Sequence, residues 1–255
     1  MHGPDLLDPN LVLRAYAMGV FPMADHRDAG SVYWVEPKQR GILPLDRFHL
    51  SRSLRKTIAR DRFTVTADKA FDRIITLCAE AAADRPDTWI NGAIEKVFLR
   101  LHDSGHAHSI ECWQDGELVG GLYGLALGRA FFGESMVSRA RDASKVALAW
   151  LVARLKVGGY RLLDCQFQTD HLESLGAVEI PRDDYMLLLA DALGTADGED
   201  PAAGVADDSL PSPDFFRLDA LAGAAGCGAF NAASSEPPLG KDIAQLLGQT
   251  SYTGS

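Results

Sequence analysis

The sequence predicts an α+β fold, because helices and antiparallel strands precede a single strand–helix–strand crossover. Residues 129–132 form an aromatic, strand-like run that ends at Gly133. Apolar residues recur at helical spacing from 148 to 155, and two glycines at 158–159 end that helix. Residues 160–163 form a second apolar run. A unit of this length is most simply a right-handed crossover that joins two parallel strands.

Two acidic side chains follow the strands of this crossover. Glu134 comes directly after the first strand, and Asp164 follows the second, with Gln166 two residues later. Parallel strands end at the same edge of a sheet, and ligands of open α/β sheets bind at that edge, so we expect the two acids to lie there together. Most acidic residues that follow strands are solvated or cap a turn. The pattern alone leaves this structural role open for Glu134 and Asp164.

The segments before the crossover alternate between helical and strand periodicity. Residues 9–19 form an amphipathic pattern with a proline near the start and a glycine at the end, which predicts a short helix. In residues 46–61, Leu50, Leu54 and Ile58 place one apolar stripe along a basic helix. Further helices are predicted at 68–82 and 91–101, and strands at 32–35, 41–44 and 63–66, with Trp34 expected in the core.

A β-hairpin is predicted at residues 109–127, where two apolar runs are joined by a turn at 114–117. Two adjacent glycines, Gly120 and Gly121, indicate a bulge or a close backbone approach in its second strand. His106 and His108 share one strand face, but no third ligand has matching spacing. Structural histidines are therefore favoured over a metal site, and we expect neither a metal nor a cofactor.

The charge of the chain is unevenly distributed along its 255 residues, whose formal net charge is −10. Acidic residues concentrate after residue 190, in a segment rich in Ala, Gly, Ser and Pro, which predicts a disordered or loosely attached tail. Within it, Phe215 and Phe216 are candidates to dock onto the body, and residues 242–247 are a candidate helical turn. Residues 38–62 hold eight Lys and Arg against two Asp, a basic patch suited to a phosphate backbone. We expect three parts: a small N-terminal domain (1–62), a catalytic domain (63–190) and the acidic tail (191–255).

The class of protein follows from what the composition lacks. No apolar run approaches the ~20 residues that a membrane span needs, so we expect no membrane association. The first ten residues have neither the basic nor the apolar region of a secretory signal. The four cysteines are scattered without a C-x-x-C pair, which indicates reduced thiols. These features predict a cytoplasmic protein.

Several motifs, in order and with few gaps from about Tyr16 to Tyr185, resemble the leucyl/phenylalanyl-tRNA–protein transferase family. In the crossover they are G-E-S-M (133–136), S-R (138–139), A-S-K (143–145), L-D-C-Q (163–166) and D-H-x-x-S-L-G-A (170–177). Upstream they are Y-A-M-G-V-F-P (16–22), S-R-S (51–53), T-W-I (88–90) and G-H-A-H-S-I-E (105–111). The resemblance implies an N-acyltransferase fold of the acetyltransferase (GNAT) type.

The resemblance also implies an activity. The family transfers Leu or Phe, and Met less well, from charged tRNA to the α-amine of proteins that begin with Arg or Lys. This transfer marks the acceptor protein for N-end-rule degradation. The partners expected are therefore the acceptor end of an aminoacyl-tRNA and such N-terminal segments. The reaction is aminolysis of an ester, which requires removal of a proton from the amine and stabilisation of the carbonyl oxygen.

Site residues are carried over from the family motifs. The catalytic group implied is Asp164, Gln166 and Glu134, in which Gln166 contacts the amine, and Asp164 polarises Gln166 or takes the proton. Glu134 orients the amine or neutralises the basic first side chain of the acceptor, and proton transfer assisted by the ribose is left open as an alternative. The apolar pocket implied for the donor side chain consists of Trp89, Leu122, Phe131, Leu151, Leu155 and Leu163. The tRNA-binding residues implied are Arg52, Arg55, Lys56, Arg60, Ser138 and Lys145. This chain has Met23 where the family often has Trp, and leucines at 151 and 155 where it has aromatic residues, which affects the preference between Leu and Phe.

Two other functions fit parts of the pattern. A GNAT acyl-CoA transferase would bind pyrophosphate on a glycine-rich loop at the helix start. Residues 138–143 supply no glycine there, and Asp142 would repel phosphate. A tRNA-binding module without catalysis is the other alternative, and the intact Glu134, Asp164 and Gln166 argue against it.

Overall fold

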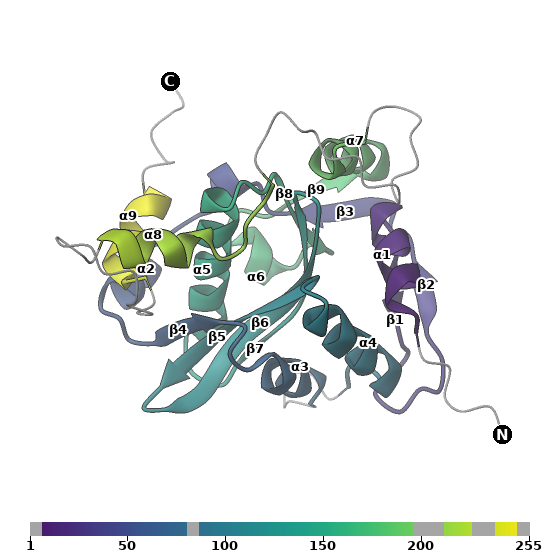
Figure 1. The fold of residues 1–255 in the computed structure, drawn as a ribbon, viewed down its shortest axis with the longest axis horizontal. Helices are drawn as coiled ribbons and strands as arrows, with labels where there is room; N and C mark the ends of the chain where they lie inside the picture. The colour runs from purple at the N-terminus through teal and green to yellow at the C-terminus, as the bar shows by residue number, and fades with distance from the viewer. Residues whose placement is uncertain (1–6, 81–86, 196–211, 226–237, 249–255) are drawn as a thin grey trace.

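A seven-stranded mixed sheet forms the centre of the molecule. The computed structural model describes residues 7–80, 87–195, 212–225 and 238–248 (Figure 1). In spatial order the strands are β4 (Thr64–Ala67), β5 (Ala107–Gln114), β6 (Glu117–Leu127), β7 (Ala130–Ser138), β8 (Leu162–Gln166), β3 (Gln39–Ile42) and β9 (Val178–Pro181). Only β7 and β8 pair in parallel. This arrangement confirms the predicted α+β class and the predicted crossover.

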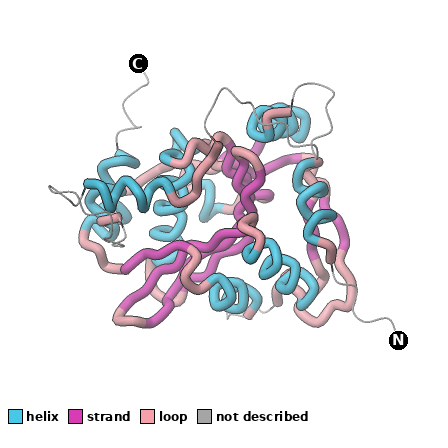
Figure 2. Tube along the Cα trace, viewed as in Figure 1, coloured by secondary structure: helices cyan, strands magenta, loops and turns pink. Residues whose placement is uncertain are grey.

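Helices cover both faces of the sheet, as Figures 1 and 2 show. One apolar cluster holds residues of α2 (Arg52–Ala59), α5 (Ala143–Val157), α6 (Asp170–Glu173), α8 (Arg217–Ala225) and α9 (Gly240–Gly248). The second cluster, on the opposite face, holds residues of α1 (Pro9–Ala17), α3 (Phe71–Ala79), α4 (Gly92–Asp103) and α7 (Arg182–Leu193). The strand–helix–strand crossover is therefore buried on both sides, which fixes its strands.

The strand β7 is longer than predicted, which corrects the expected end of the first crossover strand. It was expected to end at Gly133, but it continues to Ser138, paired with β6 on both sides of a register shift at Glu134. Its pairing with β8 stops much earlier, at Phe132 opposite Asp164. Glu134 is therefore inside a strand, not after it. A glycine in a strand weakens it but does not end it when the long partner strand β6 supplies the hydrogen bonds.

Two other local predictions are corrected. Trp34 was expected in the core, but it is 39% exposed on β2 (Tyr33–Val35), which pairs only with β1 (Phe21–Met23). The helix predicted from residue 68 begins at Phe71. Asp68 has φ +56°, and its carboxylate accepts hydrogen bonds from Ser109 N and His108 Nδ1, both at 2.7 Å. A side chain that binds the neighbouring strand cannot also start the helix.

The N-terminal part of the chain contributes to the central sheet. β3 lies between β8 and β9, and a short 3₁₀ helix (Leu45–Arg47) then leads to α2. Gly41 on β3 is required there, because an added Cβ would lie 2.6 Å from the backbone carbon of Phe167. Gly121 is required in the same way, since a Cβ would lie 2.3 Å from Ile110 O, which confirms the predicted close approach.

Parts of the acidic tail are ordered against the body: the docking expected at Phe215 and the helix expected at 242–247 are present, and disorder is corrected for those parts. Phe215 is 3% exposed and stacks on His108, with ring centroids 4.2 Å apart. Arg154 of α5, 1% exposed, donates two hydrogen bonds of 2.6 Å to Asp219 of α8. The apolar side chains of α8 and α9 gain a buried surface that composition alone did not reveal. The prediction for residues 196–211, 226–237 and 249–255 lies outside the described residues.

Within the described ranges, no helix combines the length and the apolar character that crossing a bilayer requires.

Candidate functional site

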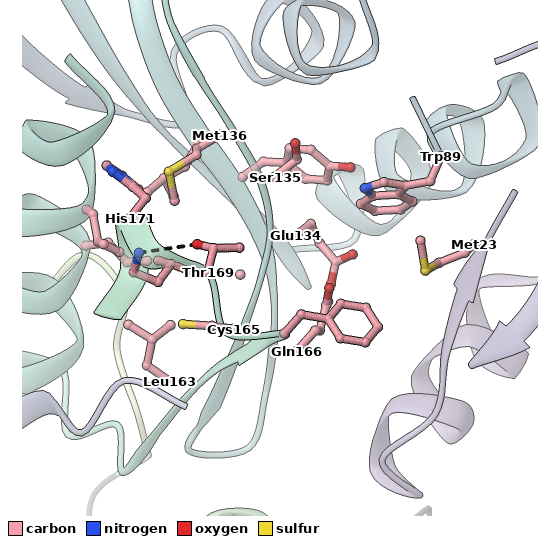
Figure 3. Close-up of a pocket in the computed structure, with 17 residues that line it drawn as sticks. Met23, Trp89, Glu134, Ser135, Met136, Leu163, Cys165, Gln166, Thr169 and His171 are labelled. Carbon is pink, nitrogen blue, oxygen red and sulfur yellow. Dashed lines mark hydrogen bonds between the residues drawn. The ribbon is translucent and has the colours of Figure 1, made fainter. Parts of the chain in front are cut away.

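A cavity of about 340 Å³ lies where β7 and β8 separate. Its wall is mostly apolar, with Glu134 and Gln166 as the polar pair in the middle. Figure 3 shows Trp89 and Met23 on one side of Glu134, and Met136, His171 and Leu163 on the other. The crossover thus places a polar pair between two apolar ends of one cavity.

The polar pair is held together by a short chain of hydrogen bonds. Gln166 Nε2 donates to Glu134 Oε1 at 2.8 Å, and Tyr16 Oη of α1 donates to the same oxygen at 2.7 Å. Glu134 is 7% exposed, and its second oxygen, Oε2, has no hydrogen-bond partner among the described residues. Burial raises the pKa of Glu134 to about 8, and the hydrogen bond from Tyr16 opposes that rise. Glu134 therefore changes its charge near neutral pH.

Gln166 adopts a backbone conformation that a glutamine rarely has. Its φ is +62°, and Phe167 N donates to Cys165 O at 2.7 Å across it, which forms a γ-turn. Such a conformation persists only where the surroundings impose it, and it is concentrated at functional sites. Asp164 Oδ1 accepts a hydrogen bond of 2.7 Å from Gln166 N and so stabilises the turn. The turn directs the Gln166 side chain toward Glu134.

Asp164 is fully buried and does not line the cavity. Arg40 of β3 donates to both of its oxygens, with Nε at 3.0 Å from each and Nη2 at 2.6 Å from Oδ2. Tyr185 Oη donates to Oδ2 at 2.7 Å. The guanidinium of Arg40 lies 4.7 Å from the ring centroid of Phe21 and 4.6 Å from that of Tyr185. Asp164 is therefore held against Arg40, and it contacts the backbone of Gln166 rather than its amide side chain.

The cavity is lined by four of the six predicted pocket residues, although Trp89 lies on the other side of Glu134 from Leu163 (Figure 3). Trp89, Leu122, Leu151 and Leu163 line it. Phe131 and Leu155 are buried elsewhere in the core, and the Phe131 ring stacks near Phe215 at 5.8 Å.

Several residues of the site were missed by sequence reasoning. Leu148 lines the cavity one helical turn before Leu151, a spacing that could have revealed it. His171 and Leu172 lie in the quoted D-H-x-x-S-L-G-A motif. The His171 Nε2 atom is buried without a partner among the described residues, and burial with the nearby Lys145 ammonium lowers the pKa of His171. Arg40 had no local signal, because its role depends on a partner far away in the chain.

The predicted tRNA-binding residues lie outside the cavity wall. Arg52, Lys56 and Arg60 are exposed on α2. Arg55 is exposed too, but its Nη2 donates to Ala244 O of α9 at 3.0 Å, so part of its hydrogen-bonding capacity is used within the chain. Ser138 is exposed at the end of β7, and Lys145 is half-buried on α5. All four cations at α2 are thus exposed, and Arg55 among them also binds α9.

Comparisons with known proteins show which family this chain resembles. The model described as "Leucyl/phenylalanyl-tRNA protein transferase" matches residues 42–190, and the model of its N-terminal domain matches residues 5–38. A relative called "Leucyl/phenylalanyl-tRNA--protein transferase" from Rhizorhabdus wittichii is 62% identical, over 96% of this chain and 99% of its own. A relative with the same name from Zymomonas mobilis is 53% identical, over 97% of this chain and 99% of its own.

One solved structure, "The structure of L-PGS from Bacillus licheniformis", aligns with a TM-score of 0.37 at 14% identity, over 63% of this chain and 53% of that chain. That likeness is too weak to carry an argument. The sequence relatives are decisive, because they span almost the whole chain and include both the N-terminal segment and the crossover. The chain belongs to the leucyl/phenylalanyl-tRNA–protein transferase family.

Proposed function

We propose that the protein moves Leu or Phe, and Met less well, from charged tRNA to the α-amine of proteins that begin with Arg or Lys. The transfer would mark those proteins for N-end-rule degradation in the cytoplasm. Family membership supports the reaction class. The observation that carries the proposal is the cavity itself, in which a buried carboxylate and an amide lie between two apolar ends.

The two ends of the cavity suit the two halves of the reaction. The aminoacyl side chain would occupy the end lined by Leu148, Leu151, Leu163 and Leu172. Its ester carbonyl would then lie beside Glu134 and Gln166, where the acceptor amine attacks. A pocket of leucine side chains can accommodate Leu or Phe, but a β-branched Val or Ile fits its shape less well. Discrimination of this kind is about 1–3 kcal/mol for each methylene.

The three predicted catalytic residues would have different roles. Gln166 and Glu134 line the cavity and would contact the reacting groups. Asp164 would be a positioning residue, because it stabilises the turn at Gln166 and is itself held by Arg40. This division explains why an acid outside the cavity wall lies in the same short motif as an amide inside it.

The tRNA would be held by its phosphates. The exposed cations of α2 (Arg52, Lys56 and Arg60) form a basic surface on a chain that is acidic as a whole. Ser138, at the end of β7, and Lys145, in the first turn of α5, would contact the nucleic-acid backbone nearer the acceptor end. Contacts of this kind position a nucleic acid and make its binding dependent on salt.

A transfer assay tests the proposal. Leu-tRNA and a peptide with N-terminal Arg should give a peptide that is one Leu longer, as detected by mass spectrometry. The matched control is the same peptide with its α-amine acetylated, which should not react. Failure to extend the free peptide with Leu-, Phe- or Met-tRNA would refute the proposal. Transfer from acetyl-CoA to the free peptide would instead support the acyl-CoA alternative.

A further inference from the structure

The two buried carboxylates of the site differ in how many of their oxygens accept a hydrogen bond. The Asp164 oxygens accept from Arg40, Tyr185 and the backbone of Gln166. Both donors to Glu134 bind the same oxygen, Oε1, which leaves Oε2 buried without a partner among the described residues. A buried acceptor without a partner is unfavourable in a folded protein and is typical of a functional site. Of the two carboxylates, Glu134 is the one that lines the cavity and that has an oxygen without a partner among the described residues.

We propose that Glu134 is the group that takes the proton from the attacking amine, and that Tyr16 is a positioning residue that sets the pH at which Glu134 does so. The inference deepens the proposed function and rests on it. It also differs from the role that the family resemblance suggested, in which Asp164 or its influence on Gln166 removes the proton.

Asp164 is a poor candidate for that role because of where it lies. It is fully buried and absent from the cavity wall, and its nearest donors are a guanidinium and a phenol. To accept a proton from a substrate it would have to leave Arg40, whose charge would then be buried and unpaired. Glu134 has no ion pair to break, because it lines the cavity and its Oε2 atom has no hydrogen-bond partner among the described residues.

The proton balance of the transfer is met by one carboxylate. The acceptor arrives as an ammonium, and its first proton goes to solvent. The nitrogen lone pair then attacks the ester carbon, and a second proton passes from nitrogen to Glu134 Oε2 as the C–N bond forms. When the C–O bond breaks, Glu134 returns this proton to the ribose 3′-oxygen, which leaves as an alcohol. The enzyme ends as it began, with Glu134 ionised.

Groups from four elements determine how readily Glu134 ionises. Burial raises its pKa to about 8, and the negative charge of Asp164 on β8 adds to that rise. The hydrogen bonds from Tyr16 on α1 and Gln166 on β8 oppose it, as does the positive charge of Arg40 on β3. Tyr185 on α7 binds Asp164 and not Glu134. Tyr16 is the one donor that can be removed without changing the two residues that line the reacting centre.

Tyr16→Phe therefore has a predicted sign. Loss of its hydrogen bond destabilises ionised Glu134, so the pKa of Glu134 rises and the acid limb of the activity profile moves to higher pH. A hydrogen bond to a charged group corresponds to a shift of about one pH unit. We expect kcat/KM to fall about tenfold at pH 7. The plateau at high pH should remain within about twofold of wild type, because Glu134 is fully ionised there.

The experiment is the pH profile of kcat/KM for transfer of Leu to a peptide with N-terminal Arg. The peptide amine itself titrates near pH 8, so the acid limb of the wild-type profile alone does not distinguish the amine from Glu134. The amine is the same in every variant, and only an enzyme group can move the limb between wild type and Tyr16→Phe. The matched control is Tyr160→Phe, a buried tyrosine of the adjoining core that makes no contact with Glu134.

A second measurement does not depend on how well Tyr16→Phe folds. In wild-type protein, the infrared band of a protonated carboxyl should disappear as the pH rises through about 8. The same band should be absent from Glu134→Gln, which should also have lost turnover. If transfer occurs but the pH profile of Tyr16→Phe coincides with that of wild type, the inference is overturned. A wild-type spectrum without this band would overturn it as well. Absence of transfer at every pH would instead overturn the proposed function.

Discussion

The ion pair between Arg40 and Asp164 offers a sharp test of how the site is built. Both side chains are at most 1% exposed, and three N–O contacts of 2.6–3.0 Å join them. Asp164→Asn keeps the shape of the side chain but leaves the guanidinium of Arg40 buried without a counter-charge. Removing one partner of a buried pair destabilises a protein by about 3–5 kcal/mol. This is a large part of the 5–15 kcal/mol that a domain typically has.

Urea denaturation followed by circular dichroism measures this change in the free energy of unfolding. The matched control is Asp191→Asn, because Asp191 pairs with Arg161 at 2.8 Å but both side chains are at least 40% exposed. We expect that control to lose less than about 1 kcal/mol. The double variant Arg40→Met/Asp164→Asn should lose less than the sum of its single variants, since no charge is left unpaired. If Asp164→Asn is no less stable than Asp191→Asn, the assignment of Asp164 as a positioning residue is wrong.

Four further outcomes are expected. Leu151→Ala should enlarge the pocket and raise the ratio of kcat/KM for Phe over Leu several-fold, measured with the two charged tRNAs in competition. Arg52→Ala should lower the salt dependence of tRNA binding by about one in slope and leave kcat unchanged, which filter binding at several salt concentrations would check. Glu134→Gln should be increasingly stabilised relative to wild type as the pH rises from about 4.5 to 8. The reason is that folding raises the pKa of Glu134 from 4.5 to about 8, so over that window the unfolded chain loses this proton while the folded wild type keeps it, and the stability of wild type falls; melting temperatures at several pH values would show it. Asp219→Ala should lower the free energy of unfolding by about 2 kcal/mol, because Arg154 stays buried without its partner; an unchanged urea midpoint would contradict this.

Local patterns were sufficient for most of the architecture. The apolar runs around Leu151 and Leu163, with the glycines between them, predicted the crossover, and β7, α5 and β8 confirm it. The family motifs named Asp164 and Gln166, and four of the six residues that they implied for the pocket line its wall. Such features are visible in a sequence because helices and strands repeat every few residues.

The tertiary structure alone decided how the site is held. Tyr16 reaches Glu134 across 118 residues, and Arg40 reaches Asp164 across 124. The order of the strands puts β3 beside β8, which turns a basic residue of the N-terminal part into the partner of Asp164. No periodicity connects positions so far apart, because it reports only on neighbours within one element. Which carboxylate remains free in the cavity depends on those long-range pairings, and therefore on the completed fold.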